Sequence, residues 1–196
     1  MGVEIDANGV WAASLSTTFG ELGAFALGDG SKDAALRVDL SGLGTVSVNG
    51  PTGGTVLVEV YDIGDNNDTR LANVSARNDV GTGNNILIAG FVVSGADPKN
   101  MLIRAVGPGL ARFIGSGVLR DPLLKIFDSG SNLVATNDNW SPSLHPSFDL
   151  TGAFAIDNLS LDAALVVTLP PGAYTAQVSG ADGGTGQAIV EIYELH

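Results

Sequence analysis

Short apolar segments separated by turn-forming residues run along almost the whole chain. Stretches rich in Val, Ile, Leu and Ala, about five to nine residues long, recur about every ten residues, with Gly, Asn and Asp between them. These segments are 34–40, 45–50, 55–62, 85–95, 100–107, 123–128, 133–138, 163–169, 174–180 and 187–194. Their spacing predicts an antiparallel sandwich or barrel, and we expect an all-β fold, an antiparallel β-sandwich of the jelly-roll type.

The order of residues within and between these segments adds detail. In residues 56–61, three valines alternate with Leu, Glu and Tyr, which predicts a strand with one buried face. Residues 128–132, Asp-Ser-Gly-Ser-Asn, lie between two apolar segments and predict a hairpin turn. Residues 107–119 break the strand pattern and predict a short helical turn.

The chain also repeats part of itself. Trp11–Leu40 and Trp140–Leu169 agree at 15 of 30 aligned positions, and after small gaps the match continues from 55–62 into 187–194. Such agreement indicates a duplication, with one and a half copies of a unit. The expected parts are the second half of a repeat unit at 1–63 and a complete β-sandwich unit at 64–196.

Composition restricts the class of protein. The formal net charge is −12, because 16 Asp and 5 Glu face 9 Lys and Arg, and this argues against nucleic acid as a partner. An acidic surface rich in Asp and Asn is typical of a soluble extracellular protein or of a calcium binder. There is no Cys, so disulfides are excluded. No apolar run reaches the roughly 18 residues of a membrane span, and the opening residues do not form a signal peptide.

Two groups of segments resemble known bacterial domains. Residues 123–139, with an apolar strand, a Gly-containing hairpin and an Asn-Asp turn, and residues 169–180, with Pro-Pro-Gly-Ala-Tyr leading into a strand, resemble the bacterial pre-peptidase C-terminal domain. Residues 70–95 and 100–110 resemble tandem repeats of large secreted bacterial surface proteins. The resemblance implies a calcium-tolerant β-sandwich, extracellular or at the cell surface, of the kind appended to secreted enzymes.

The sequence predicts that the chain is not an enzyme. Its imidazoles are His145, in a proline-flanked stretch that predicts a loop, and the terminal His196. The first copy has Ser16 in place of His145, so a duplicated catalytic site would not share this residue. No Gly-x-Ser-x-Gly motif, zinc-ligand cluster or phosphate-binding loop occurs. Paired carboxylates for glycoside hydrolysis stay open, because their spacing is set in three dimensions.

Calcium is the cofactor that the residue types favour most. Oxygen ligands gather at Asp62, Asp65, Asn66, Asn67 and Asp68, and a smaller group lies at Asn137 and Asp138. The same residue types are also the favoured turn formers, because their side chains bond to the local backbone. Asp33 and Asp162, at matching places in the two copies, are expected to cap turns before a strand.

Two tryptophans occupy matching positions in the copies. Trp11 and Trp140 are candidate ligand-binding residues, because aromatic rings in sandwich loops stack on sugars. The alternative is that each ring fills the end of a core beside Phe19 or Phe148.

Two functions of different classes follow from these patterns. The first is a non-catalytic structural or adhesive module of a secreted or cell-surface bacterial protein. Its partners are further copies of itself or neighbouring repeats, with assembly head to tail through strand edges into filaments. The second is a calcium-assisted carbohydrate- or matrix-binding module appended to a secreted hydrolase. Neither involves membrane insertion.

Overall fold

The computed structural model describes residues 4–40, 42–52, 54, 56–63 and 71–196. The chain divides into two compact units, Met1–Arg70 and Leu71–His196, which we describe separately. The sequence repeat predicts a boundary between residues 63 and 64, and residues 64–70 lie outside the described part. None of the described helices is long and apolar enough to cross a membrane.

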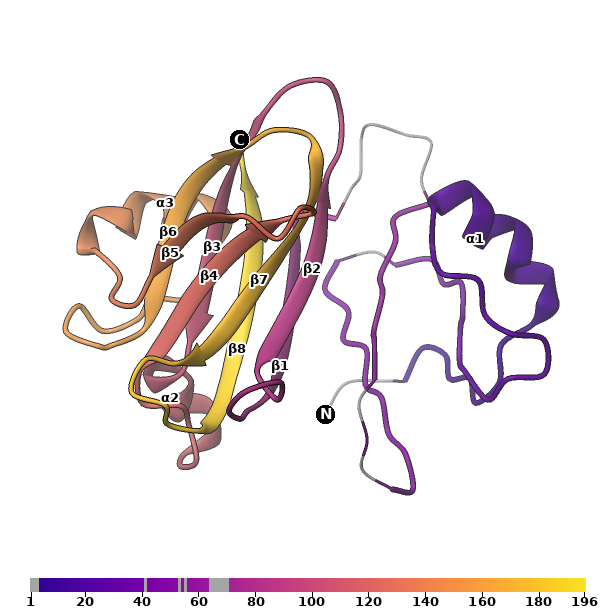
Figure 1. Ribbon diagram of the computed structural model, residues 1–196, viewed down its shortest axis with the longest axis horizontal. Helices are drawn as coiled ribbons and strands as arrows, with labels where there is room; N and C mark the ends of the chain where they lie inside the picture. The colour runs from indigo at the N-terminus through magenta and orange to yellow at the C-terminus, as the bar shows by residue number, and fades with distance from the viewer. Residues whose placement is uncertain (1–3, 41, 53, 55, 64–70) are drawn as a thin grey trace. The chain divides into compact units, whose positions relative to one another are not determined.

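The unit Leu71–His196 is a sandwich of two antiparallel sheets (Figure 1). One sheet has the strand order β1-β8-β3-β6 and the other the order β2-β7-β4-β5, as in a jelly roll. This confirms the fold class. The strands are β1 (Asn73–Val80), β2 (Leu87–Val93), β3 (Lys99–Val106), β4 (Pro122–Asp128), β5 (Leu133–Asn137), β6 (Ala163–Leu169), β7 (Gly172–Gly180) and β8 (Gly186–Leu195).

The first core lies between the two sheets. Each strand contributes alternate residues to it, because successive side chains of a strand point to opposite faces. In β3, Ile103 and Ala105 point into this core, and in β8 Val190 and Ile192 do so. Its larger side chains also include Leu119, Leu124, Ile126, Leu169, Tyr174 and Val178.

A second core covers the outer face of the sheet β1-β8-β3-β6. Residues 140–156 lie across this face and include η3 (Pro142–Leu144) and α3 (His145–Thr151) (Figure 1). Their Trp140, Phe148, Ala153 and Ile156 pack with Leu102, Val106, Ala164 and Tyr193 of the strands. The sheet is therefore buried on both faces along β3, which explains the nearly continuous apolar sequence there.

Three features of the sandwich differ from the sequence-based expectations. His145 was expected in a loop but begins α3, because Pro146 lies in the first turn, where its missing N–H has no intrahelical partner. Strand β1 was not predicted, since its sequence is largely polar and half its length is exposed. The helical turn expected within 107–119 is confirmed as η2 (Pro108–Leu110) and α2 (Ala111–Ile114).

The predicted hairpin at residues 128–132 is confirmed. It joins β4 to β5, and the Asp128 carboxylate accepts hydrogen bonds from the backbone N–H of Gly130 at 2.9 Å and of Asn132 at 2.8 Å. The Asn132 side chain also donates to this carboxylate, at 3.0 Å from Oδ2. These bonds lower the pKa of Asp128, those from Asn132 most strongly.

The unit Met1–Arg70 begins with the same helical arrangement as residues 140–152. It has η1 (Ala13–Leu15) and α1 (Ser16–Leu22), and Gly23 ends α1 in the left-handed conformation. The strands expected at 34–40, 45–50 and 55–62 are not found in the described residues of this unit. A strand needs a hydrogen-bonded neighbour, and apolar alternation alone does not supply one.

Gly107 directly follows β3, and a substitution there tests the close packing of the sandwich. A Cβ atom there would overlap the backbone carbonyl oxygen of Leu119, which has little freedom to move. We expect Gly107→Ala to lower the free energy of unfolding by about 1–3 kcal/mol, measured by urea denaturation. Gly90, in β2, has open space around its Cβ position. Gly90→Ala is therefore the matched control, and an equal loss in both variants would contradict the steric explanation.

Asp128 gives the hairpin a pH dependence. Because its folded-state pKa lies below the ordinary value of 3.8, its bonds favour the folded state above pH 3.8. That contribution is lost as the pH falls through the folded-state pKa. We expect the stability difference between the wild type and Asp128→Ala to shrink on acidification from about pH 6 to about pH 3. Urea midpoints at the two pH values measure this difference, and a constant difference would refute the assignment.

Candidate functional site

A charged residue lies in the middle of the buried sheet. Arg104, in β3, is fully buried. Because side chains alternate along the strand, Arg104 lies on the same face as Leu102 and Val106, under the covering residues 140–156. A buried guanidinium is costly to desolvate, so its partners determine whether this arrangement is stable.

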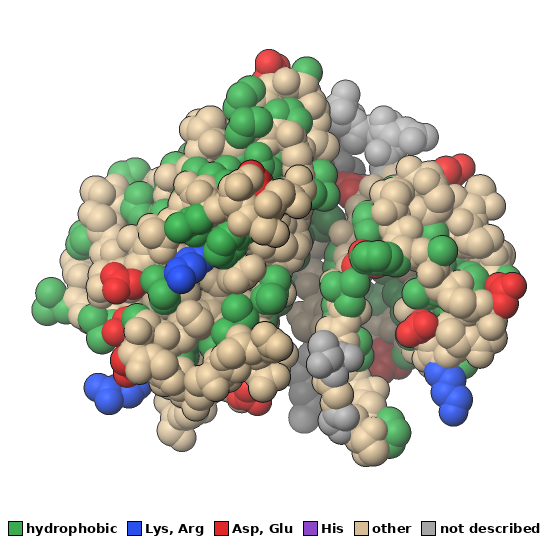
Figure 2. Space-filling model, in the orientation of Figure 1, with side chains coloured by type: hydrophobic (Ala, Val, Ile, Leu, Met, Phe, Trp, Pro, Cys, Tyr) green, Lys and Arg blue, Asp and Glu red, His purple; other side chains and the backbone are tan. Residues whose placement is uncertain are grey.

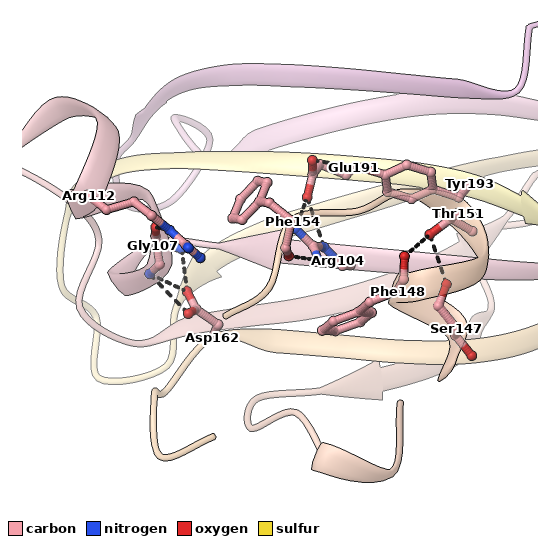
Figure 3. Close-up of polar contacts among 11 residues, drawn as sticks. Arg104, Gly107, Arg112, Ser147, Phe148, Thr151, Phe154, Asp162, Glu191 and Tyr193 are labelled. Carbon is pink, nitrogen blue, oxygen red and sulfur yellow. Dashed lines mark hydrogen bonds and ion pairs between the residues drawn. The ribbon is translucent and has the colours of Figure 1, made fainter. Parts of the chain in front are cut away.

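Arg104 has partners from two other parts of the unit (Figure 3). Its Nε donates to Oε2 of Glu191 in β8 at 2.9 Å, and Nη2 forms an ion pair with the same oxygen at 2.6 Å. Nη1 donates to the backbone carbonyl of Phe154 at 2.7 Å. The guanidinium carbon lies 4.6 Å from the ring centre of Phe148 and 4.5 Å from that of Phe154. Arg104 thus connects β3, β8 and the covering segment.

Glu191 and Tyr193 complete this polar cluster. The Tyr193 hydroxyl donates to Oε1 of Glu191 at 3.0 Å, so both carboxylate oxygens of Glu191 accept hydrogen bonds. Burial, followed by the negative charge of Glu191, raises the pKa of Tyr193. Tyr193 therefore stays a protonated donor over the physiological pH range. The side chains of Arg104, Glu191 and Tyr193 thus bind one another, which is typical of a structural network.

A second buried carboxylate fixes the turn after β3. Asp162 accepts hydrogen bonds from the backbone N–H of Gly107 at 2.8 Å and of Gly109 at 3.0 Å (Figure 3). The Ser160 hydroxyl donates to it at 2.8 Å. A Cβ atom on Gly109 would lie 2.9 Å from the Asp162 carboxylate, so the turn needs glycine there. Asp162 thus caps a turn, as its position before β6 predicted.

Both candidate ligand-binding tryptophans are buried. Trp140 is 5% exposed and stacks on Phe148 with ring centres 5.2 Å apart. Trp11 is 8% exposed and lies 5.6 Å from Phe19. The indole N–H of each also donates to a backbone carbonyl, that of Asp157 for Trp140. Trp140 thus belongs to the second core, and both rings are almost fully buried beside a phenylalanine. A role of the two rings in ligand binding stays a prediction.

The candidate calcium ligands fall into two groups. Asp62 is described, whereas Asp65, Asn66, Asn67 and Asp68 lie outside the described residues. The Asn137 side chain accepts from the Ala164 N–H at 3.0 Å and donates to the Asn139 carbonyl, and Asp138 accepts from the Asn139 side chain. Within the described residues, no group of three or more His, Cys, Asp or Glu is placed to hold a metal ion.

A surface depression of the sandwich lies near α2. Its volume is about 410 Å³, and it is lined by Pro108, Gly109, Arg112, Ala155, Ile156 and Asp157. Arg112 lies against the Phe154 ring at 5.1 Å and donates to the Gly109 carbonyl at 3.3 Å. None of the six lining residues is a hydroxyl, thiol or imidazole nucleophile. His145 lies elsewhere, bonded to Asn158 at 2.8 Å and edge-on to Trp140.

The unit Met1–Arg70 reproduces contacts of the sandwich at the repeat offset. The Trp11 backbone N–H donates to the Asp33 carbonyl at 2.9 Å, as that of Trp140 donates to Asp162 at 2.9 Å. The Trp11 indole donates to the Gly28 carbonyl, which is the counterpart of Asp157. Helices α1 and α3 each have seven residues.

The counterpart of Glu191 is Glu59. The Tyr61 hydroxyl donates to Glu59 at 3.0 Å, the same distance as between Tyr193 and Glu191. Within the described residues, no Lys or Arg forms an ion pair with Glu59. The acceptor is therefore present in this unit, and no described arginine is paired with it.

Comparisons with known proteins give matches among solved structures, and not among family models or curated proteins. No protein-family model matches the chain, and no curated protein matches it. Among solved structures, the chain is similar to the pre-peptidase C-terminal domain of a collagenase from Bacillus anthracis. The TM-score is 0.38 and the identity 17%, over 61% of this chain and 88% of that chain. This neighbour is a domain of the type that residues 123–139 and 169–180 resemble.

Sequence reasoning did not single out Arg104 or Glu191. The available signal was a charged residue in the middle of an apolar strand: Arg104 in Met-Leu-Ile-Arg-Ala-Val, and Glu191 in Ile-Val-Glu-Ile-Tyr. The same Glu occurs in the first copy as Glu59. A charge at the centre of a strand that is buried on both faces needs a partner of opposite charge. The strands that carry Arg104 and Glu191 were therefore candidates for neighbours in one sheet.

The contribution of Arg104 is testable by substitution. We expect Arg104→Met to lower the free energy of unfolding by about 3–5 kcal/mol, because Glu191 is then buried without its cation. Adding Glu191→Gln is expected to recover more than half of this loss. The control is Lys99→Met, which removes a partly exposed ion pair with Glu194 and is expected to cost at most about 1 kcal/mol. Equal losses for Arg104→Met and Lys99→Met, by urea denaturation, would refute the role of Arg104.

Proposed function

We propose that the chain is a non-catalytic structural or adhesive repeat module of a secreted or cell-surface bacterial protein. The observation that supports this most is the set of contacts found in both copies of the repeat. They share Trp–Phe packing, a left-handed Gly after a seven-residue helix, and a Tyr–Glu hydrogen bond. All of these are interior or local contacts. A duplication that repeats packing favours a module used for architecture.

The distribution of reactive groups also favours a non-catalytic role. The buried charges Arg104, Asp162 and Glu191 are engaged with backbone amides, carbonyls, ring faces and one another. His145 belongs to the second copy alone, since Ser16 occupies its place in the first. Its bond to Asn158 and its packing on Trp140 are structural contacts.

Association with copies of itself or with neighbouring repeats is the finer part of the proposal. The sandwich has four edge strands, β1, β6, β2 and β5. Exposed apolar side chains lie on all four of them: Val74 on β1, Val166 on β6, Ile88 and Val92 on β2, and Leu133 and Val134 on β5. Such edges pair with strands of other chains, and head-to-tail pairing would produce filaments.

The alternative, a calcium-assisted carbohydrate- or matrix-binding module, gains less support. The burial of Trp11 and Trp140 argues against their role as sugar platforms. Calcium itself stays a prediction. A place where it would have an electrostatic effect is Asp121, whose pKa is raised by burial and then by the charges of Asp138 and Asp182. A bound cation would offset the repulsion among these carboxylates.

Light scattering after size-exclusion chromatography tests this proposal. The molar mass is measured over a concentration series with calcium and again with a chelator. We expect growth into larger species with concentration, since exposed strand edges favour pairing, and a monomer under all conditions would contradict self-assembly. Loss of association in chelator would support a role for calcium, and Asp138→Asn would then distinguish its contribution from that of residues 62–68.

A further inference from the structure

The jelly-roll topology makes the two halves of the sandwich depend on each other. We call residues 71–139, with β1 to β5, the first half, and residues 140–196, with β6 to β8, the second half. Strand β6 pairs with β3, β7 pairs with β2 and β4, and β8 pairs with β1 and β3. Every strand of the second half therefore pairs only with strands of the first half.

Residues 11–63 are a second half by sequence, and their apolar side chains are exposed. Leu40 is 51% exposed, whereas its counterpart Leu169 is fully buried. Val58 is 48% exposed, whereas its counterpart Val190 is fully buried. Val56 and Val60 are exposed in the same way, whereas their counterparts Ala188 and Ile192 are buried. Figure 2 shows apolar side chains at the surface of this unit. The strands that bury such side chains in the sandwich are those of the first half.

The polar groups of this unit indicate what kind of strand would fit. Glu59, Phe19 and Phe25 are the counterparts of Glu191, Phe148 and Phe154, which surround Arg104 in the sandwich. By sequence they are the acceptor and the two rings that a guanidinium in the same place would contact. Asp33 is the counterpart of Asp162, which binds the amides of the turn that follows Arg104.

A buried polar atom supports this assignment. The Ser31 hydroxyl is buried without a hydrogen-bond partner, whereas its counterpart Ser160 donates to Asp162. In the sandwich, Asp162 is held beside Ser160 by the amides of Gly107 and Gly109. Without those amides, Asp33 is exposed and makes no hydrogen bond to Ser31 in the described residues.

The first half at 71–139 is already occupied, because β6, β7 and β8 pair with its strands in the sandwich. The partner of residues 11–63 must therefore bring a first half that is not occupied in this way.

We propose that residues 11–63 bind the first half of another repeat module and form a second sandwich with it. The β3-like strand of that partner carries an Arg followed by Gly three and five residues later, the spacing of Arg104, Gly107 and Gly109. Its arginine pairs with Glu59 between the Phe19 and Phe25 rings, and its glycine amides bind Asp33. This inference rests on the proposed function as a repeat module and specifies the partner.

The experiment supplies this partner within one chain. A copy of residues 64–139 is placed directly before Trp11 of the full chain, in place of residues 1–10, so that it precedes 11–63 as 64–139 precedes 140–196. Hydrogen exchange is then compared between the original and the extended chain. We expect the amides of 34–40 and 56–62 to exchange at least about 100-fold more slowly in the extended chain, because they become part of a sheet.

A matched variant tests the chemistry of the pairing. The substitution Arg104→Met, made in the added copy alone, is expected to remove most of the new protection, and Glu59→Gln is expected to do the same. The amides of residues 71–196 are the internal control, since their sandwich is unchanged in all these chains. Protection that survives both substitutions would overturn the arginine assignment.

Two further results would overturn the proposal as a whole. One is unchanged rapid exchange of 34–40 and 56–62 in the extended chain while residues 71–196 stay protected. The other is protection of these amides in the original chain, either at all concentrations or rising with concentration, which would mean completion from within or by a second copy. Light scattering on the original chain tests the proposed function separately. Failure of the proposed function can therefore be told from failure of the proposed binding to another module.

Discussion

The buried ion pair between Arg104 and Glu191 is the interaction on which the sandwich depends most. It lies in a sheet covered on both faces, where Arg104 is fully buried and Glu191 is 5% exposed. A buried pair of charges is stable only with partners in good geometry, which requires β3, β8 and the Phe154 carbonyl to be in register together. The pair therefore selects one arrangement of these segments over other apolar packings.

The same pair explains why half of this fold cannot form alone. Arg104 comes from the first half, and Glu191 and the two phenylalanines come from the second. The jelly roll places strands of the two halves next to each other in both sheets, so neither backbone pairing nor charge pairing is complete within one half. Among the described residues of 11–63, the local contacts of Trp11 and α1 form, and no strand is found.

Local patterns could predict much of the fold, and their failures are instructive. Short apolar segments between turn-forming residues predicted β2 to β8, and Asp and Gly predicted the hairpin at 128–132, because these signals need only neighbouring residues. Strand β1 was missed because its pairing with β8 compensates for a polar sequence. The strands predicted in residues 34–62 show the opposite error, since alternation was present and pairing was not.

The sequence by itself determined the strand composition, the repeat and the turns, because each depends on residue type and local spacing. It also marked Trp11 and Trp140, and only the tertiary structure placed them in cores. Tertiary structure alone decided which strands are neighbours, and that Arg104 and Glu191, 87 residues apart, meet. Pairing over such a distance depends on the complete set of strands, which is why similar local patterns give a sheet in one copy and no strand among the described residues of the other.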